Sequence, residues 1–240
     1  MTPESCQRWA AHDAALTTCR RCPRLVQHRE HVAGTRAQFR GQPYWARPVP
    51  GLGDRGARIL VVGLAPAAHG ANRTGRMFTG DRSGDFLFAS LARAGLASQS
   101  TSVAMDDGLT LKGVFITAAV HCAPPDNHPT PEEVRACAPY LAEEAQLLGR
   151  VRVYVCLGSL AWASVRRLLA AAGAPVPSPQ VPFGHLAEWK PPGSWPTVLG
   201  SYHPSQQNTF TGRLTAAMMD RVWTRARTLA DSHDADGLSP

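Results

Sequence analysis

The sequence predicts an α/β fold in which helices cover both faces of a central, mainly parallel four-stranded sheet, a three-layer α/β/α sandwich. Two observations carry this prediction. Four short runs are almost entirely apolar, as strands buried on both faces are, and segments with helical periodicity separate them. With 240 residues, 44% of them hydrophobic, the chain suits one domain, so we expect residues 1–240 to form a single unit.

The four strands are expected at residues 58–64 (RILVVGL), 114–120 (VFITAAV), 151–157 (VRVYVCL) and 196–202 (PTVLGSY). Helices are expected at residues 1–18, 83–96, 130–148, 159–172 and 211–229. The clearest helix start is Thr130, because Pro131 and two glutamates follow it and all favour a first turn. Residues 173–195 predict an ordered Pro- and Gly-rich loop, and the tail from about residue 231 is expected to be disordered.

The stretch after the first strand, residues 63–81 (GLAPAAHGANRTGRMFTGD), is the most unusual part of the chain. It contains neither G-x-x-x-x-G-K-[ST] nor G-x-G-x-x-G, so it is not indicated as a phosphate-binding loop. Its small residues, beginning with Gly63 and Ala65 on either side of Leu64, allow a ligand to approach the backbone closely. Phe78 and Asp81 then return toward the same place, which predicts a pocket.

Two further polar loops follow predicted strands. Residues 201–208 carry His203, and residues 121–131 carry Asn127. Because the carboxyl ends of parallel strands meet at one crevice, we expect these loops to face residues 63–81. A capped structural histidine and a turn asparagine are the alternative interpretations, and the strand-end position favours a function for His203.

The cysteines indicate a metal site. Cys19 and Cys22 form a C-x-x-C pair, and Cys122 and Cys137 follow as separated single residues. Four thiolates in this arrangement could ligate zinc or an iron–sulfur cluster. The absence of a second C-x-x-C favours a cluster, but spacing alone leaves the metal undecided. Cys156 lies inside a predicted strand and is interpreted as a small buried hydrophobic residue.

The charge balance leaves two explanations open. The formal net charge is +7, and Lys112 and Lys190 are the only lysines among 25 basic residues. A positive surplus suits a polyanion such as DNA, although an arginine-favouring genome explains it equally well. No window is apolar enough for a membrane span, so we expect no membrane partner. The first residues lack the pattern of a signal peptide, so a cytoplasmic location is expected.

The two loops GLAPAAHGANRTGRMFTGD and YHPSQQNTFTGRLT, together with CRRCPRLV and CAPPDNHPTPEE, resemble the family 5 uracil-DNA glycosylases. These are the broad-specificity branch of the iron–sulfur members of the uracil-DNA glycosylase superfamily. The resemblance covers about residues 18–222, and four separate motifs agree in order. It implies a four-iron four-sulfur (4Fe-4S) cluster on Cys19, Cys22, Cys122 and Cys137.

The resemblance also implies a monofunctional base-excision repair enzyme that hydrolyses the N-glycosidic bond of deaminated bases in DNA and leaves an abasic site. Uracil, hypoxanthine and xanthine are the expected bases, with ethenocytosine as a further candidate, and the enzyme is expected to act as a monomer. The sister branch carries an acidic residue where this chain has Leu64, and a base-reading Asn at the position that corresponds to Ala118. Family 5 shares both departures, and the loss of the Asn predicts broad specificity.

Within this resemblance each residue receives an expected role. Phe78 stacks on a base flipped out of the helix, and the backbone of Gly63, Leu64 and Ala65 reaches the edge of the base. His203 stabilises the departing base, Asp81 supports the cationic sugar and orients the water, and Asn127 positions the same water.

The remaining expectations concern DNA contacts. Gln206, Gln207 and Asn208 fill the space that the base vacates, and Arg213 reaches a phosphate. Three alternatives remain: a non-catalytic metal-stabilised nucleic-acid-binding protein, a redox-sensing cluster protein, and a phosphate-dependent hydrolase of free nucleosides.

Overall fold

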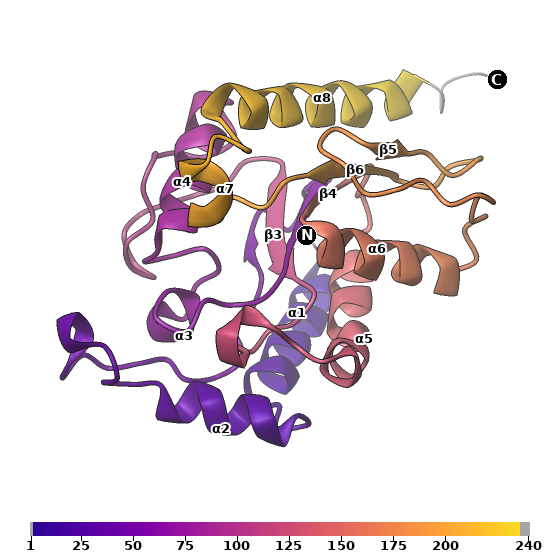
Figure 1. The fold of residues 1–240 in the computed structure, drawn as a ribbon. Helices are drawn as coiled ribbons and strands as arrows, with labels where there is room; N and C mark the ends of the chain where they lie inside the picture. Colours follow the sequence, from indigo (N-terminus) through magenta and orange to yellow (C-terminus); the bar gives the residue numbers. More distant parts are fainter. Residues whose placement is uncertain (1, 236–240) are drawn as a thin grey trace.

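The computed structural model describes residues 2–235 and contains one six-stranded sheet with the order β1-β3-β2-β4-β6-β5 (Figure 1). The four central strands are β2 (Ile59–Gly63), β3 (Val114–Ala118), β4 (Val153–Leu157) and β6 (Thr197–Ser201). All neighbouring pairs among them are parallel, and every residue in them is buried. The predicted mainly parallel sheet is therefore confirmed.

The prediction of four strands is wrong in number. Two further strands, β1 (Leu52–Gly53) and β5 (Glu188–Trp189), pair antiparallel with β3 and β6 at the two edges. Each is two residues long, which is too short to produce the alternation or the apolar run by which a strand is recognised in a sequence. Only the tertiary fold brings these segments beside a sheet edge.

The helices cover both faces of the sheet. The structure has α1 (Pro3–Thr17), α2 (Pro23–His31), η1 (Ala37–Phe39), α3 (Ala71–Thr74), α4 (Arg82–Arg93), η2 (Pro125–Asn127), α5 (Pro131–Leu148), α6 (Ser159–Ala171), α7 (Gln206–Phe210) and α8 (Ala216–Ala235). On one face α4 and α8 pack on the sheet, and on the other α1, α5 and α6 do so (Figure 1). Alternate strand residues, such as Val61 and Val62 of β2, enter the two cores.

All five expected helices form, and the last of them differs from its expected limits at both ends. Thr130 caps α5 in a capping box with Glu133, as the sequence around Thr130 indicates. The last helix begins at Ala216 instead of residue 211. Gly212, which follows α7, has a φ of 73° and cannot continue a right-handed helix. It continues to Ala235, so residues 231–235 of the expected disordered tail are helical, and residues 236–240 lie outside the described part. No described helix is both long and apolar enough to cross a bilayer.

The strand order places the crevice of the molecule. From β2 the chain crosses to β3 on one side and later to β4 on the other, so the loops after β2 and β4 separate at this point. In open parallel sheets such a switch point opens a crevice at the carboxyl ends of the strands.

Candidate functional site

A cleft lies at the carboxyl ends of the central strands, and the loops after β2, β3, β4 and β6 line it. The structure brings together most of the residues that the sequence singled out. Those that line the cleft are Leu64, Ala65, Phe78, Asp81, Ala118, Asn127, His203, Gln206, Gln207, Asn208 and Arg213. Gly63 lies directly beneath them at the end of β2, in register with Ala118 at the end of β3.

Phe78 is held in a constrained position over the floor of the cleft. Its φ of 52° lies in the left-handed region, which is costly for a bulky residue and is most often found at functional sites. A Cβ on Gly63 would lie 2.9 Å from Cζ of the Phe78 ring, so only glycine allows the ring to rest there. The ring centroid is 6.0 Å from that of His203, with 31° between the planes.

Asp81 caps the helix that follows it. Its Oδ1 accepts a hydrogen bond of 3.0 Å from the backbone N–H of Gly84, in the first turn of α4. Its Oδ2 lies against Gly70, where a Cβ would be only 2.1 Å away. Burial raises the pKa of Asp81 above its ordinary value, against the opposing effect of the backbone hydrogen bonds from Gly84 and Ser83.

His203 follows β6 and faces Phe78 across the cleft. Burial lowers the pKa of His203 to about 4, so the imidazole is neutral at neutral pH. The backbone around it is ordered by Asn208, whose Nδ2 donates to the carbonyl of His203 at 2.8 Å. Asn208 therefore makes an internal contact in addition to lining the cleft.

Asn127 approaches the cleft from the loop after β3. It is exposed, and both it and Asp126 adopt positive φ angles, 58° and 53°, within η2. Asparagine and aspartate tolerate this region better than most residues, so the sequence PDN suits the turn. Ala118, at the start of the same loop, is buried and contributes only a methyl group to the floor.

The outer wall of the cleft is polar and basic. Gln206 and Gln207 are exposed on α7, and the Cζ of Arg213 lies 4.7 Å from the ring centroid of Tyr202. Phe210 at the end of α7 is 69% exposed, and the Cζ of Arg82 lies 5.7 Å from its ring centroid. No sequence pattern distinguished Phe210 from an ordinary helix residue.

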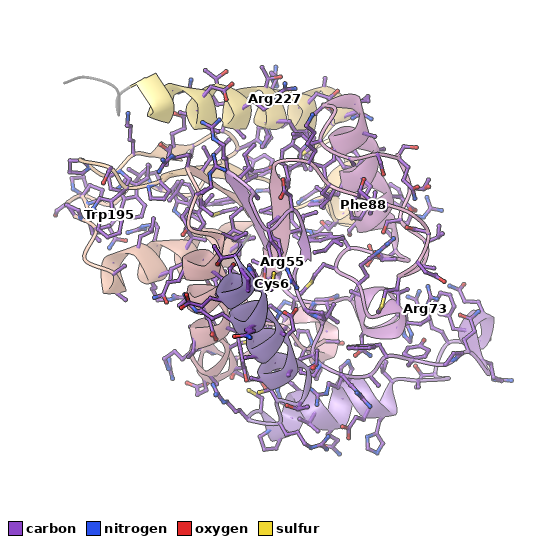
Figure 2. The ribbon with its side chains drawn as sticks, turned by 180° about the vertical axis from the view of Figure 1, so that it is seen from behind. Cys6, Arg55, Arg73, Phe88, Trp195 and Arg227 are labelled. Atoms are coloured by element: carbon purple, nitrogen blue, oxygen red, sulfur yellow. The ribbon has the colours of Figure 1, made fainter. Side chains whose placement is uncertain are left out.

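A second set of cleft residues was missed because it comes from a segment before β1. Arg36 and Phe39 line the cleft beside His69 of the first loop. The rings of Phe39 and His69 are stacked with centroids 6.1 Å apart, and the guanidinium of Arg73 lies 4.2 Å from the Phe39 centroid. Figure 2 shows Arg73 on the side of the molecule from which this segment projects. Arg36 and Phe39 lie in a segment that reads as an ordinary loop, so nothing in the local sequence indicates that they contact the cleft.

Cys19, Cys22, Cys122 and Cys137 line one cavity, and no carboxylate is among its lining residues. Arg29 of α2 donates from Nη1 to Cys122 Sγ at 2.9 Å, and the backbone N–H of His121 donates to Cys137 Sγ at 3.3 Å. Burial raises the pKa of Cys122 to about 11, against the opposing effect of Arg29.

Sulfur donors supported by N–H groups suit a soft metal or an iron–sulfur group. Within residues 2–235, however, no three His, Cys, Asp or Glu side chains are arranged around a single-ion position. The remaining cysteines lie elsewhere: Cys156 is buried in β4, and Cys6 is exposed on α1 (Figure 2).

Comparison with known proteins gives a consistent result. Residues 50–227 match the family model of the Uracil DNA glycosylase superfamily. Type-5 uracil-DNA glycosylase from Thermus thermophilus is 56% identical over 215 residues, which cover 90% of this chain and 95% of the relative. The protein of the same name from Mycobacterium tuberculosis is 52% identical over 91% of this chain and 80% of its own length. Type-4 uracil-DNA glycosylase from Archaeoglobus fulgidus is 31% identical over 65% of this chain and 70% of its own.

Proposed function

The chain belongs to the uracil DNA glycosylase superfamily and groups with its type-5 members, and we propose that it removes uracil from DNA by hydrolysing the N-glycosidic bond. The observation that supports this activity best is the cleft itself. Phe78, Asp81 and His203 come from two loops far apart in the chain and face one space above the small residues Gly63 and Ala118.

A base inside a duplex is out of reach, so the nucleotide must first turn out of the helix into the cleft. Phe78 offers a ring that rests directly against the backbone of Gly63, on a main chain with a positive φ. We propose that this ring stacks on the base. Stacking on a fixed surface recovers part of the energy lost on unstacking and fixes the angle of the bond to be broken.

Breaking the glycosidic bond leaves negative charge on the base and positive charge on the sugar. A neutral imidazole can donate one hydrogen bond to the base as that charge develops, and His203 is neutral at neutral pH. An ionised Asp81 supports the sugar cation from the other side and orients the attacking water. Asn127, at the cleft edge, holds the same water.

The absence of an amide side chain at position 118 underlies the second part of the proposal. The side chains of Ala118 and Leu64 carry no polar group, so neither side chain can form a hydrogen bond with the edge of a base. A pocket that does not pair with the uracil edge cannot strongly reject a base with a different pattern of donors and acceptors. We therefore propose that hypoxanthine, xanthine and ethenocytosine are also released.

We propose that Cys19, Cys22, Cys122 and Cys137 hold a 4Fe-4S cluster. The support is the common cavity of four sulfur donors, with Arg29 and the N–H of His121 directed at two of them. When bound, the cluster would cross-link α2, the loop after β3 and α5. Its role would be structural, because hydrolysis of a glycosidic bond requires no electron transfer. Iron and sulfide analysis with the visible absorption spectrum of the purified protein distinguishes a cluster from zinc.

The experiment that tests the activity uses a panel of oligonucleotides carrying uracil, hypoxanthine, xanthine or ethenocytosine, single- and double-stranded. Abasic sites are revealed by alkaline cleavage. We expect strand breaks at uracil and at the other three bases. Binding without strand breaks would favour a non-catalytic nucleic-acid-binding protein, and breaks at uracil alone would contradict the proposed breadth.

A further inference from the structure

Helix α2 borders the cysteine cavity with Leu25 and Val26, and its Arg29 side chain forms hydrogen bonds with the cysteine segments. The side chain is only 2% exposed. Its Nη1 donates to Cys122 Sγ at 2.9 Å, and its Nη2 donates to the carbonyl of Cys19 at 3.2 Å. One guanidinium therefore joins cysteine segments from two distant parts of the chain.

The backbone of the same residue contacts the cleft loop. The carbonyl oxygen of Arg29 accepts a hydrogen bond of 3.1 Å from Nδ2 of Asn72, a residue of α3 that is completely buried. The last carbonyls of a helix have no partner within the helix, and Arg29 is near the end of α2. The side chain of Asn72 therefore caps α2 from the neighbouring loop.

Asn72 also determines the shape of the first loop. Its Nδ2 lies 3.3 Å from the carbonyl of Ala68, and its backbone N–H donates to the carbonyl of Ala67 at 3.1 Å. Ala67 and Ala68 line the cleft together with Gly70, against which Asp81 rests. A shift of Asn72 would therefore move the residues that position the substrate.

The burial of Arg29 needs a countercharge. A guanidinium removed from water is costly unless an anion is near, and the nearest carboxylate, on Glu30, lies 3.9 Å away and is bound at 2.5 Å by Arg20. Nε of Arg29 has no hydrogen-bond partner in the described part of the chain. Sulfur is the acceptor at 2.9 Å, and it carries negative charge when the cysteines ligate a metal group.

We propose that Arg29 and Asn72 form a positioning pair that joins the cysteine cavity to the substrate cleft. Ligation by the cysteines fixes the side chain of Arg29, and this fixes the end of α2. Asn72, which is hydrogen-bonded to the carbonyl of Arg29, in turn fixes the backbone of Ala67 and Ala68. The inference rests on the proposed cysteine-bound cluster and on the proposed glycosylase activity. It assigns neither residue a contact with DNA.

The first test replaces Asn72 with Asp, which has nearly the same shape but presents oxygen where Nδ2 donated. We expect the iron content and visible absorption to stay at the wild-type level, while the single-turnover rate of uracil release falls about 10²-fold, as for a catalytic group displaced by about 1 Å. A wild-type rate in this variant overturns the proposal. Asn72→Leu removes the donor without adding charge and serves if Asn72→Asp does not fold.

The second test works from the other end of the pair. Arg29→Gln is compared with Arg20→Gln, a matched control, because Arg20 also lies near Cys19 but is exposed and bound to Glu30. We expect Arg29→Gln to speed the loss of visible absorption under a chelator and to lower the reduction potential, since a donor to sulfur is removed. The control should match the wild type, and equal effects in both variants would overturn the role of Arg29.

The coupling itself is read in two ways. In a double-mutant cycle of Arg29→Gln and Asn72→Asp, effects on the excision rate should not add, whereas additivity would show two independent residues and overturn the pair. Hydrogen exchange at residues 64–75 needs no activity and separates this inference from the proposed function. We expect Arg29→Gln, but not Arg20→Gln, to accelerate exchange there. Unchanged exchange overturns the coupling even if uracil is released, and accelerated exchange supports it even if uracil is not.

Discussion

Three glycines hold the reactive side chains of the cleft. Gly63 leaves room for the ring of Phe78, and Gly84 leaves room for its carbonyl, since a Cβ there would lie 1.6 Å from the oxygen. Gly70 leaves room for the carboxylate of Asp81. Close backbone contacts fix the ring and the carboxylate before the reaction begins. Such preorganisation is the main source of electrostatic stabilisation in catalysis.

The role of Asp81 can be separated from its role as a helix cap. Asn caps a helix about as well as Asp, and burial disfavours the ionised form of Asp81, so Asp81→Asn should change the free energy of unfolding by at most about 1 kcal/mol. The single-turnover rate of uracil release should fall about 10²- to 10³-fold because the sugar cation loses its counterion. Thermal unfolding, DNA affinity and the excision rate are measured together. A fall in rate matched by an equal fall in DNA affinity would contradict the assignment.

The pH dependence of the excision rate distinguishes Asp81 from His203, which are both partly buried in the cleft. Asp81 acts when ionised, and its pKa is raised, so the rate should fall with decreasing pH at a higher pH than for an exposed Asp. His203 has a pKa of about 4 and should stay neutral through the neutral range. Single-turnover rates between about pH 4 and 8 test this. A fall in rate centred near the ordinary histidine pKa of 6.5 that disappears in His203→Gln would show that the imidazole is not buried as described.

Ala118 can be tested for its part in specificity. Ala118→Asn places an amide at the floor of the cleft, where it can pair with the edge of uracil but not equally with hypoxanthine. We expect the ratio of uracil to hypoxanthine excision to rise about tenfold or more, which corresponds to the discrimination that a single polar contact supplies. Ala118→Val is the control for size alone. An unchanged ratio in Ala118→Asn would show that residue 118 does not determine which bases are released.

At the scale of elements, α1 is joined to α5 by a buried polar contact that the cleft does not use. His12 is 1% exposed, and its Nδ1 lies 3.1 Å from Oε2 of Glu143. Its Nε2 lies 3.7 Å from Oε1 of the fully buried Glu144, which in turn lies 3.9 Å from His121. Burial by itself lowers the pKa of His12, but the nearby carboxylate of Glu144 and the hydrogen bond to Glu143 outweigh it, so the pKa is raised above 6.5.

This contact predicts a pH-dependent stability. A group whose pKa is higher in the folded state binds its proton more tightly there. Its stabilisation is therefore complete below pH 6.5 and is lost as the pH rises through the folded-state pKa. The difference in unfolding free energy between the wild type and His12→Gln should shrink over that interval. Denaturant unfolding at a series of pH values measures it, and a difference that grows with pH would reverse the sign and exclude a protonated His12. Asp13 and Arg55 form a neighbouring ion pair and are present in both proteins.

At the scale of the whole molecule, the two large cores on either face of the sheet contain no cysteine of the cavity, whereas a third, smaller cluster surrounds it. That cluster contains Leu16 of α1, Leu25 of α2 and Tyr140 of α5. Helix α2 has no residue in either large core. Its attachment depends on the third cluster around the cysteines, on Arg29 and on the ion pair between Arg24 and Glu133 of α5. We propose that residues 1–240 act as one domain and as a monomer.

Removal of the proposed iron should therefore release one part of the molecule first. After treatment with a chelator and an oxidant, we expect limited proteolysis to cut residues 19–40 at least about tenfold faster, because locally opened segments are cut in proportion to their open population. Cleavage near α8 should stay slow because its apolar residues lie in a large core. Uniform acceleration along the chain would show that the cysteines stabilise the whole domain, not the α2 region.

Much of the fold could be predicted because its signals are local. The four central strands are recognisable because strands buried on both faces need an unbroken apolar run, and α5 is recognisable because its cap and first turn lie within four residues. The candidate site residues were found at strand ends because a parallel sheet brings those ends together. Arg36 and Phe39 were missed, since their place in the cleft depends on how distant segments pack.

The sequence by itself determined the four central strands, the loops that form the cleft and the family. Only the tertiary structure decided the state of the groups within them. The burial that keeps His203 neutral, the close contact between Phe78 and Gly63, and the bond from Asn72 to Arg29, 43 residues away, are all long-range properties. Periodicity and motif spacing describe neighbours along the chain, whereas the pKa of a side chain and the position of a loop depend on neighbours in space.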